Sequence, residues 1–191
     1  MLEQIYLVIK KTPINKTDLI DLVPILKELD GFEYHHPLHP YPILEHSIKA
    51  AETLEGEFLR LAMIFHDIGK LYTSLKVPDK RNQDAFVMKS PNHEAESARI
   101  VNDLFKDEMD KQSLNTLAKL IEYHDTPLTT KDDETVMKQL IKEYGLNFVE
   151  SLLKMQRADM STHSKKYYEK QMKPQLDYAD DVFTKKYKKD M

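Results

Sequence analysis

The sequence predicts an all-α protein, a bundle of about six to eight helices. Only four of its 191 residues are glycine, whereas leucine, isoleucine, glutamate, lysine and methionine are abundant. This composition favours helices over sheets. Apolar side chains also recur at helical spacing along most of the chain. A length of 191 residues suits one domain with a substantial core.

Capping residues and helix breakers indicate where the helices begin and end. Thr17 is a suitable N-cap for a helix over residues 18–29. We expect Pro24 to perturb that helix and Gly31 to end it. Ser90 is a suitable cap for a later helix that begins with a proline. The predicted helices are 2–10, 18–29, 42–55, 57–68, 91–106, 113–125, 132–143 and 145–163.

Two segments do not fit the helical pattern. Residues 34–42 read YHHPLHPYP, and their three prolines exclude a regular helix, so we expect an extended, rigid connector. Residues 70–90 form a polar stretch that is too long for a simple turn in a bundle, which predicts a lid or a substrate-binding loop. The basic residues of this stretch are Lys76, Lys80, Arg81 and Lys89.

The composition excludes several classes of protein. The net charge of −4 provides no global positive field to recruit nucleic acid. The absence of cysteine excludes disulfides and thiolate metal sites, which leaves histidine, aspartate and glutamate as metal ligands. The longest apolar run, Leu61–Phe65, is too short to span a membrane, and the N-terminus lacks the basic start of a signal peptide. We therefore expect a soluble, cytoplasmic protein with no membrane partner.

Six side chains of metal-ligand type are predicted to point into the protein. His124 lies three residues after Ile121 and extends an apolar stripe of its helix. The pair His66–Asp67 ends the most apolar helix of the chain, inside the run FHDIGK. Comparable positions on other predicted helices complete the set, which is His46, His66, Asp67, His93, His124 and Asp159.

The burial of these groups favours a bound metal. An isolated buried carboxylate costs several kcal/mol or shifts its pKa until it is neutral. A bound cation removes this cost because metal–ligand bonds replace the lost hydration. Taken singly, each histidine is better explained as a hydrogen-bonded core residue than as a metal ligand. Together, four histidines and two aspartates predict a nitrogen–oxygen site for Mn, Fe, Co or Zn, with Mg less well suited.

The ordered motifs resemble a known family. The stretches LEHSIKAA, LAMIFHDIGK, SPNHEAESARIV, IEYHD and QRADMSTH resemble the HD-domain superfamily of metal-dependent phosphohydrolases. The lead-in GFEYHHPLHPYPILEHS is similar to the approach to the first histidine in the HD domains of bacterial tRNA nucleotidyltransferases. The Gly-Ser and Asp-x-Asp signals of a nucleotidyl-transferring head do not precede it.

The resemblance implies a single HD-type domain over residues 1–191. Its core is expected at about 34–163, which is the part that the motifs cover, with a helical extension over 1–31. The lysine-rich segment 164–191 is expected to be a solvated helix or a frayed tail. Nucleic-acid contact by that segment is a minor alternative.

The resemblance also implies a set of metal ligands. The ligands expected for one metal are His46, His66, Asp67 and Asp159. His93 and His124 match the positions that hold a second metal in some members, with Asp67 as the bridge. We therefore expect two divalent transition-metal ions, of Mn, Fe, Co, Ni or Zn, with Mg as a further candidate. In members with one metal, equivalent polar residues serve instead as proton donors or phosphate contacts.

Two metals that share a hydroxide provide a nucleophile at neutral pH. Asp67 and Lys70 are the expected catalytic residues, and Lys70 is also the best candidate to hold charge on the phosphoryl oxygens. An exposed lysine at a helix end explains Lys70 equally well. Arg157 and His163, which flank Asp159, are further substrate-binding candidates.

Other basic residues are weaker candidates for substrate contact. They are Arg99 and the four basic residues of the 70–90 stretch. The histidines of the connector, His35, His36 and His39, are candidates for the mouth of the pocket, and a cluster on the surface explains them at least as well.

The expected function is that of a metal-dependent phosphomonoesterase or phosphodiesterase that acts through a metal-bound hydroxide. A nucleotide or an RNA-end phosphoester is the expected substrate, because the lead-in resembles that of the nucleotidyltransferases. One alternative is an HD-fold di-iron oxygenase, which uses the same six ligands; Lys70 favours hydrolysis over that reading. The other alternative is a non-catalytic HD module that binds a nucleotide or RNA.

Overall fold

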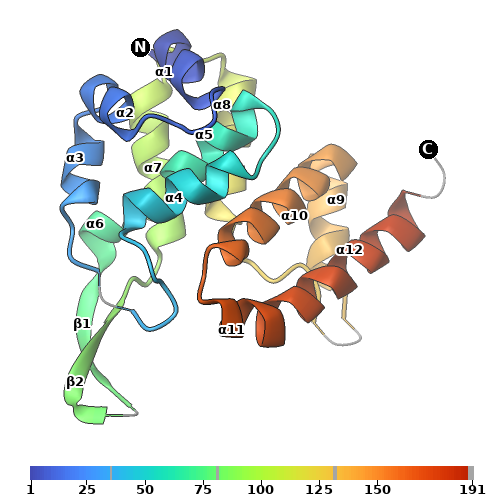
Figure 1. The fold of residues 1–191 in the computed structure, drawn as a ribbon. Helices are drawn as coiled ribbons and strands as arrows, with labels where there is room; N and C mark the ends of the chain where they lie inside the picture. Colours follow the sequence, from blue (N-terminus) through green and yellow to red (C-terminus); the bar gives the residue numbers. More distant parts are fainter. Residues whose placement is uncertain (35, 81, 131–132, 189–191) are drawn as a thin grey trace.

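Helices make up most of the chain, as predicted, and a single two-stranded hairpin interrupts them among the described residues (Figure 1). The computed structural model describes residues 1–34, 36–80, 82–130 and 133–188. The helices before the hairpin are α1 (Leu2–Ile9), α2 (Lys16–Leu22), α3 (Ile25–Asp30), α4 (Ile43–Glu52), α5 (Glu57–Phe65) and α6 (Lys70–Thr73). The helices after it are α7 (His93–Phe105), α8 (Lys111–Glu122), α9 (Thr135–Tyr144), α10 (Leu146–Ser161), α11 (Lys165–Tyr167), the π-helix η1 (Tyr168–Met172) and α12 (Lys173–Tyr187).

Pro24 divides the predicted helix 18–29 into α2 and α3. Proline lacks the backbone N–H that continues a helix, and it also disfavours the helical conformation of the residue before it. The cap of α2 is Asn15 and not Thr17, because the Asn15 side chain accepts hydrogen bonds from the backbone N–H groups of Thr17 and Asp18. The helix predicted from residue 91 begins at His93, after Asn92 in the left-handed conformation.

The polar stretch 70–90 is not the loop that the sequence predicts. It folds as α6 followed by an antiparallel hairpin of β1 (Leu75–Asp79) and β2 (Asn82–Lys89), in which Val77 pairs with Val87. β-Branched and aromatic residues suit such a pleated surface. The hairpin projects away from the helices at the end of the molecule where the connector lies (Figure 1).

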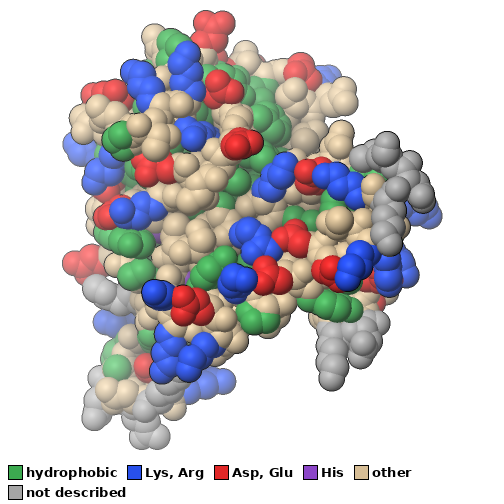
Figure 2. Space-filling view, turned by 45° about the vertical axis from the view of Figure 1, so that its right-hand side comes forward, with side chains coloured by type: hydrophobic (Ala, Val, Ile, Leu, Met, Phe, Trp, Pro, Cys, Tyr) green, Lys and Arg blue, Asp and Glu red, His purple; other side chains and the backbone are tan. Residues whose placement is uncertain are grey.

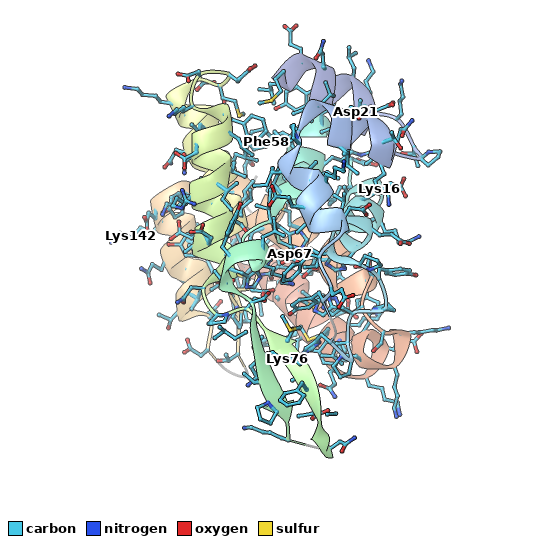
Figure 3. The ribbon with its side chains drawn as sticks, turned by 90° about the vertical axis from the view of Figure 1, so that its left-hand side faces the viewer. Lys16, Asp21, Phe58, Asp67, Lys76 and Lys142 are labelled. Atoms are coloured by element: carbon cyan, nitrogen blue, oxygen red, sulfur yellow. The ribbon has the colours of Figure 1, made fainter. Side chains whose placement is uncertain are left out.

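The core lies where α4, α5, α7, α8 and α10 meet. Residues 61–65 of α5 are entirely or almost entirely buried, so the most apolar helix of the sequence is the central one. Figure 3 places Asp67, which follows α5, inside the molecule just above the hairpin that carries Lys76. Within the described part of the chain, no helix combines the length and apolarity needed to cross a membrane.

Of the two expectations for the lysine-rich C-terminal segment, a solvated helix or a frayed tail, its described part up to residue 188 forms helices, and one of them is packed against the protein. The helix α12 lies across α10 (Figure 1) and buries Leu176, Ala179, Val182 and Phe183. Ion pairs on this helix join Lys173 to Asp177 and Lys185 to Asp181. Basic and acidic side chains are interspersed on the face of the molecule that Figure 2 shows.

Candidate metal centre

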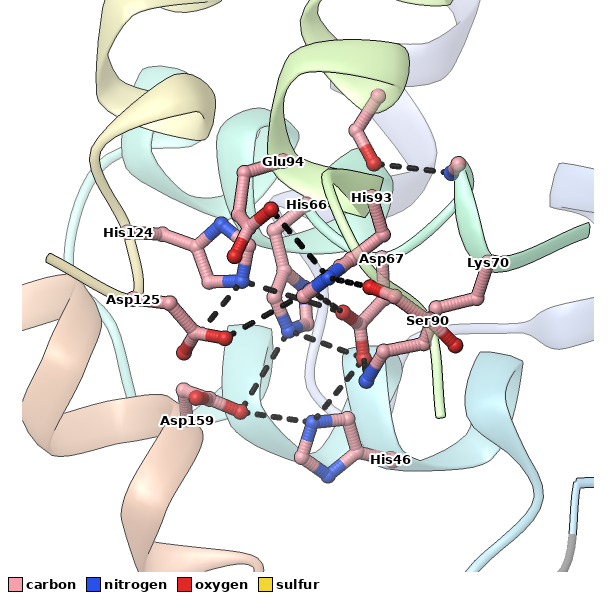
Figure 4. Close-up of polar contacts among 12 residues, drawn as sticks. His46, His66, Asp67, Lys70, Ser90, His93, Glu94, His124, Asp125 and Asp159 are labelled. Atoms are coloured by element: carbon pink, nitrogen blue, oxygen red, sulfur yellow. Dashed lines mark hydrogen bonds and ion pairs between the residues drawn. The ribbon is translucent and has the colours of Figure 1, made fainter. Parts of the chain in front are cut away.

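The six predicted ligands come together at one buried site (Figure 4). The helix α4 carries His46, and the end of α5 carries His66 and Asp67. The first residue of α7 is His93, His124 follows α8, and Asp159 lies near the end of α10; each of the six is at most 6% exposed.

Asp67 lies at the centre of the site, and its two oxygens face different histidines. Its Oδ2 atom is 3.8 Å from Nε2 of His46 and 3.5 Å from Nε2 of His66. Its Oδ1 atom is 3.1 Å from Nε2 of His93 and 3.9 Å from Nε2 of His124. The carboxylate therefore belongs to two groups of potential metal ligands, one on each side.

Asp159 completes the first of these groups. Its Oδ1 atom lies 2.7 Å from Nε2 of His46 and 3.4 Å from Nε2 of His66. Two imidazole nitrogens and two carboxylates thus converge from three helical segments on this side of Asp67.

Backbone carbonyls fix the tautomers of three of the histidines. The Nδ1 atoms of His66, His93 and His124 lie 2.7, 2.9 and 2.7 Å from carbonyl oxygens. Each of these carbonyls belongs to the residue three positions earlier in the chain. Because a carbonyl oxygen only accepts, Nδ1 must carry the hydrogen, and Nε2 of the neutral ring presents a lone pair to the site.

Thr162 fixes the fourth histidine in the same way. Its hydroxyl donates to the carbonyl of Asp159 at 2.7 Å, and the same oxygen lies 2.7 Å from Nδ1 of His46. Since the single hydroxyl hydrogen is used by the carbonyl, Nδ1 of His46 is the donor to Thr162. Nε2 of His46 then presents a lone pair toward Asp159 and Asp67.

This arrangement fits a divalent metal. Among the described residues, Nε2 of His46, His66 and His93 and Oδ1 of Asp67 are buried without a hydrogen-bond partner. Lone pairs and carboxylates that face one another in a dry interior are costly unless a cation lies between them. Imidazole nitrogen and carboxylate oxygen are the ligands that Mn, Fe, Co, Ni and Zn accept.

Nearby carboxylates increase the proton affinity of two of the histidines. Burial lowers the pKa of His66, but the carboxylates of Asp67 and Asp159 outweigh burial and raise that pKa to about 9. The pKa of His93 is raised by Asp67 against the effect of burial. The pKa of His124 is lowered, chiefly by burial. His66 and Lys70 hold the pKa of Asp67 well below the usual range despite burial, and His46 and His66 do the same for Asp159.

Lys70 is part of the site and not an exposed lysine at a helix end. It is 5% exposed, and its Nζ atom lies 2.6 Å from Oδ2 of Asp67. Burial lowers the pKa of Lys70, yet the Asp67 carboxylate more than compensates and keeps the ammonium charged. The ring of Tyr34, in the connector, lies over this ammonium at 5.2 Å.

Gly69 lets Asp67 approach His93. A Cβ atom on Gly69 would lie 2.3 Å from the carbonyl oxygen of His93 and 2.7 Å from the backbone nitrogen of Ser97. The Gly69 N–H instead donates to the hydroxyl of Ser97 at 2.8 Å. The run HDIGK thus places its aspartate against the start of α7 because it contains a glycine at this position.

The structure separates the two predicted substrate-binding residues that flank Asp159. His163 is buried beside the site, with its ring 5.4 Å from that of His46 and its Nδ1 donating to the Asp159 carbonyl at 3.2 Å. Arg157 is not brought to the site. Its guanidinium binds carboxylates of α12, Asp177 at 2.9 Å and Asp180 in a still closer contact.

The weaker basic candidates that the structure describes also lie outside the metal cluster. Arg99 is exposed and pairs with Glu96 and Asp103, and Lys76 lies over the ring of Phe86 on the hairpin. Lys80 and Lys89 are exposed on the hairpin. The predicted candidates Arg81 and His35 fall outside the described residues.

Sequence reasoning did not single out two acidic residues at the edge of the site. Asp125 lies with Oδ2 3.6 Å from Nε2 of His93 and Oδ1 3.7 Å from Nε2 of His124. Glu94 lies 3.5 Å from Nδ1 of His93. Glu94 directly follows His93, and Asp125 directly follows His124. An acidic residue directly after a predicted ligand histidine is therefore the sequence signal that could have identified them.

Comparison with known families decides the assignment of the chain. The family model of the HD domain matches residues 34–176. The chain belongs to the HD-domain family. The HD-domain match includes all six residues of the cluster, and it extends beyond the predicted core boundary at 163 into α12. Comparison with curated proteins gives no match. The similarity of the lead-in to that of tRNA nucleotidyltransferases stays a prediction.

Proposed function

We propose that this protein is a metal-dependent phosphohydrolase that acts on a nucleotide or an RNA-end phosphoester. The observation that carries the proposal is the position of Asp67, whose two oxygens face different pairs of histidines. A carboxylate in this position can bridge two metal ions, and pairs of ions about 3.5–4 Å apart are typical of phosphatases and nucleases. Membership of the HD-domain family supports the same reaction class.

The described residues supply ligands for both ions. The proposed ligands of the first are His46, His66, Asp67 and Asp159. Asp67, His93 and His124 are the proposed ligands of the second, and Asp125 lies at its exposed edge. Bound divalent ions supply a water of lowered pKa and positive charge for the phosphoryl oxygens.

Lys70 is the residue that would provide a positive charge of the protein's own beside the metal ions. The ammonium is buried and held against Asp67, so solvent screens it little. We propose that Lys70 keeps the Asp67 carboxylate in its bridging orientation and stabilises negative charge on the phosphoryl group. His163 is the second proposed substrate contact: its Nδ1 donates to the Asp159 carbonyl, so its Nε2 can accept a hydrogen bond from a hydroxyl group of the substrate.

Phosphoester hydrolysis with defined metals tests the proposal. Protein loaded with Mn, Co, Ni, Mg or Fe is supplied with nucleoside monophosphates, cyclic nucleotides, dinucleoside polyphosphates and RNA with 2′,3′-cyclic ends. We expect metal-dependent hydrolysis of at least one of these classes without oxygen uptake, and its loss in Asp67→Ala. The matched control is Asp103→Ala, which removes an exposed carboxylate from α7 and should leave the rate unchanged.

Two results would assign the site to another function. Iron-dependent oxygen consumption without hydrolysis of any phosphoester would place the protein with the di-iron oxygenases. Tight binding of nucleotides by metal-loaded protein, without turnover under any metal, would indicate a non-catalytic module.

A further inference from the structure

A cleft lies between the connector and the hairpin, beside the metal centre. Its volume is about 300 Å³, which is within the range of small-molecule binding sites. The connector contributes Tyr34, His36 and His39 to its walls, and the hairpin contributes Asp79, Phe86 and Val87.

Aromatic rings dominate the connector side of this cleft. The rings of Tyr34 and His36 are stacked with centroids 6.3 Å apart, and the rings of His36 and His39 meet edge to face at 5.2 Å. Phe86, from the hairpin side, is 53% exposed although it is large and apolar. A phenylalanine that remains exposed in a cleft lined by other rings is suited to contact a flat ligand.

The cleft adjoins the proposed catalytic groups through two of its lining residues. The ring of His39 lies 4.3 Å from that of His163 and 5.4 Å from that of His46. The ring of Tyr34 lies over Nζ of Lys70 at 5.2 Å. A ligand whose phosphoryl group lies at the metal centre can therefore extend its remaining part into this cleft.

The lining of the cleft indicates which part of a ligand it suits. The described lining residues of the cleft are mostly rings, and two lysines outside that lining lie over them, Lys70 over Tyr34 and Lys76 over Phe86. The cleft therefore offers chiefly ring faces to a ligand. Ring faces match a nucleobase, because bases stack on aromatic side chains.

We propose that this cleft binds the nucleoside part of the substrate, with the nucleobase stacked among Tyr34, His36 and Phe86. This inference rests on the proposed function and identifies the part of the protein that recognises the base of the substrate. Base-free sugar phosphates use only the metal centre, and the protein discriminates against them.

Adenosine binding tests the cleft without any hydrolysis, because adenosine has no phosphoryl group. Binding is measured by ligand-observed NMR for the full-length protein, for Phe86→Ala and for Tyr72→Ala. Tyr72 is a matched control, since it is an aromatic residue that is 59% exposed and does not line the cleft. We expect Phe86→Ala to weaken adenosine binding roughly tenfold and Tyr72→Ala to leave it unchanged.

A second arm compares adenosine 5′-monophosphate with ribose 5-phosphate as substrates of the metal-loaded protein. We expect kcat/KM to be higher for the nucleotide. Phe86→Ala should lower kcat/KM for the nucleotide more than for ribose 5-phosphate and so remove that preference, whereas Tyr72→Ala, outside the cleft, should leave both values unchanged. Absence of adenosine binding, equal binding by Phe86→Ala, or equal kcat/KM for the two phosphoesters would overturn the cleft assignment. If adenosine binds but neither these two phosphoesters nor any of the wider panel reacts, the proposed hydrolase activity would be overturned instead.

Discussion

Each of the four cluster histidines uses one ring nitrogen to fix the direction of the other. The Nδ1 atoms of His66, His93 and His124 donate to carbonyls three residues earlier in the chain, whereas that of His46 donates to Thr162. Local carbonyls cannot be removed by mutation, but the hydroxyl of Thr162 can. Hydrogen bonds of this kind orient metal-binding histidines and contribute to metal affinity.

We expect Thr162→Val to weaken metal binding about 10–100-fold, because His46 loses the acceptor that fixes its tautomer. Thr162→Ser keeps the hydroxyl and should restore the affinity. Calorimetric titration of metal-free protein with Mn²⁺ measures both variants. Equal affinities for Thr162→Val and the unaltered protein would show that His46 does not depend on Thr162.

Metal binding should also depend on pH. The raised pKa of His66, about 9, means that its ring is protonated at pH 7 in metal-free protein and must lose a proton to bind a metal. Apparent affinity should therefore rise from pH 6 to pH 8, by up to about tenfold per pH unit for each proton released. Mn²⁺ titrations in buffers of different ionisation enthalpy count the protons, and a flat profile would contradict the prediction.

The same raised pKa makes the metal-free protein less stable as the pH rises, whereas it makes metal binding tighter. The protonated ring of His66 stabilises the folded state fully below the ordinary pKa of 6.5, and this contribution is lost as the pH rises through about 9. In metal-loaded protein the His66 ring would be neutral and bound to the metal. The loaded protein should therefore not lose this stability between pH 6.5 and about 9. Thermal unfolding with and without Mn²⁺ at several pH values would distinguish the two forms.

At the scale of the elements, the close contact between Gly69 and α7 positions Asp67. We expect Gly69→Ala to destabilise the fold by about 1–3 kcal/mol, since the added Cβ would meet backbone atoms of His93 and Ser97. Displacement of α7 should also reduce binding at the His93 side of the site. Gly31→Ala is the control, because its Cβ would lie no closer than 3.6 Å to another atom.

Denaturant unfolding and metal stoichiometry check this prediction together. A Gly69→Ala variant as stable as Gly31→Ala, with unchanged metal content, would show that α7 accommodates the methyl group without effect on the site.

Helical periodicity predicted where most helices lie, because a buried face repeats at helical spacing whatever it packs against. The hairpin was not predicted, since residues 75–89 alternate only weakly and include many charged side chains. The cap of α2 was assigned to Thr17 because several polar residues adjoin the helix start, and only backbone geometry identifies Asn15.

At the scale of the whole molecule, α12 joins the C-terminal segment to α10. We expect Phe183→Ala to destabilise the protein by about 3 kcal/mol, because Phe183 is buried in the core. For a chain of this length, the melting temperature should fall by roughly 6–12 °C. Tyr178→Ala, which removes an exposed aromatic ring from the same helix, should change it little. Equal melting temperatures for the two variants would show that α12 adds no stability.

The burial of the six cluster residues could be predicted because each residue's own helix determines its direction. These residues lie at the ends or on the inner faces of apolar helices, so their spacing alone indicated burial. Arg157 differs because its partners, Asp177 and Asp180, belong to a helix far along the chain. The role of Thr162 depends on a contact with His46 from another helix, which spacing along the sequence cannot show.

The central claim is that Asp67 bridges two metal ions, and metal content tests it most directly. Protein reconstituted with Mn²⁺, freed of excess metal and analysed by mass spectrometry should retain about two equivalents per chain. Asp67→Ala should retain almost none while its circular dichroism remains helical. Asp67→Ala protein that retains as much metal as the unaltered chain, or an unaltered chain that retains none, would contradict the account.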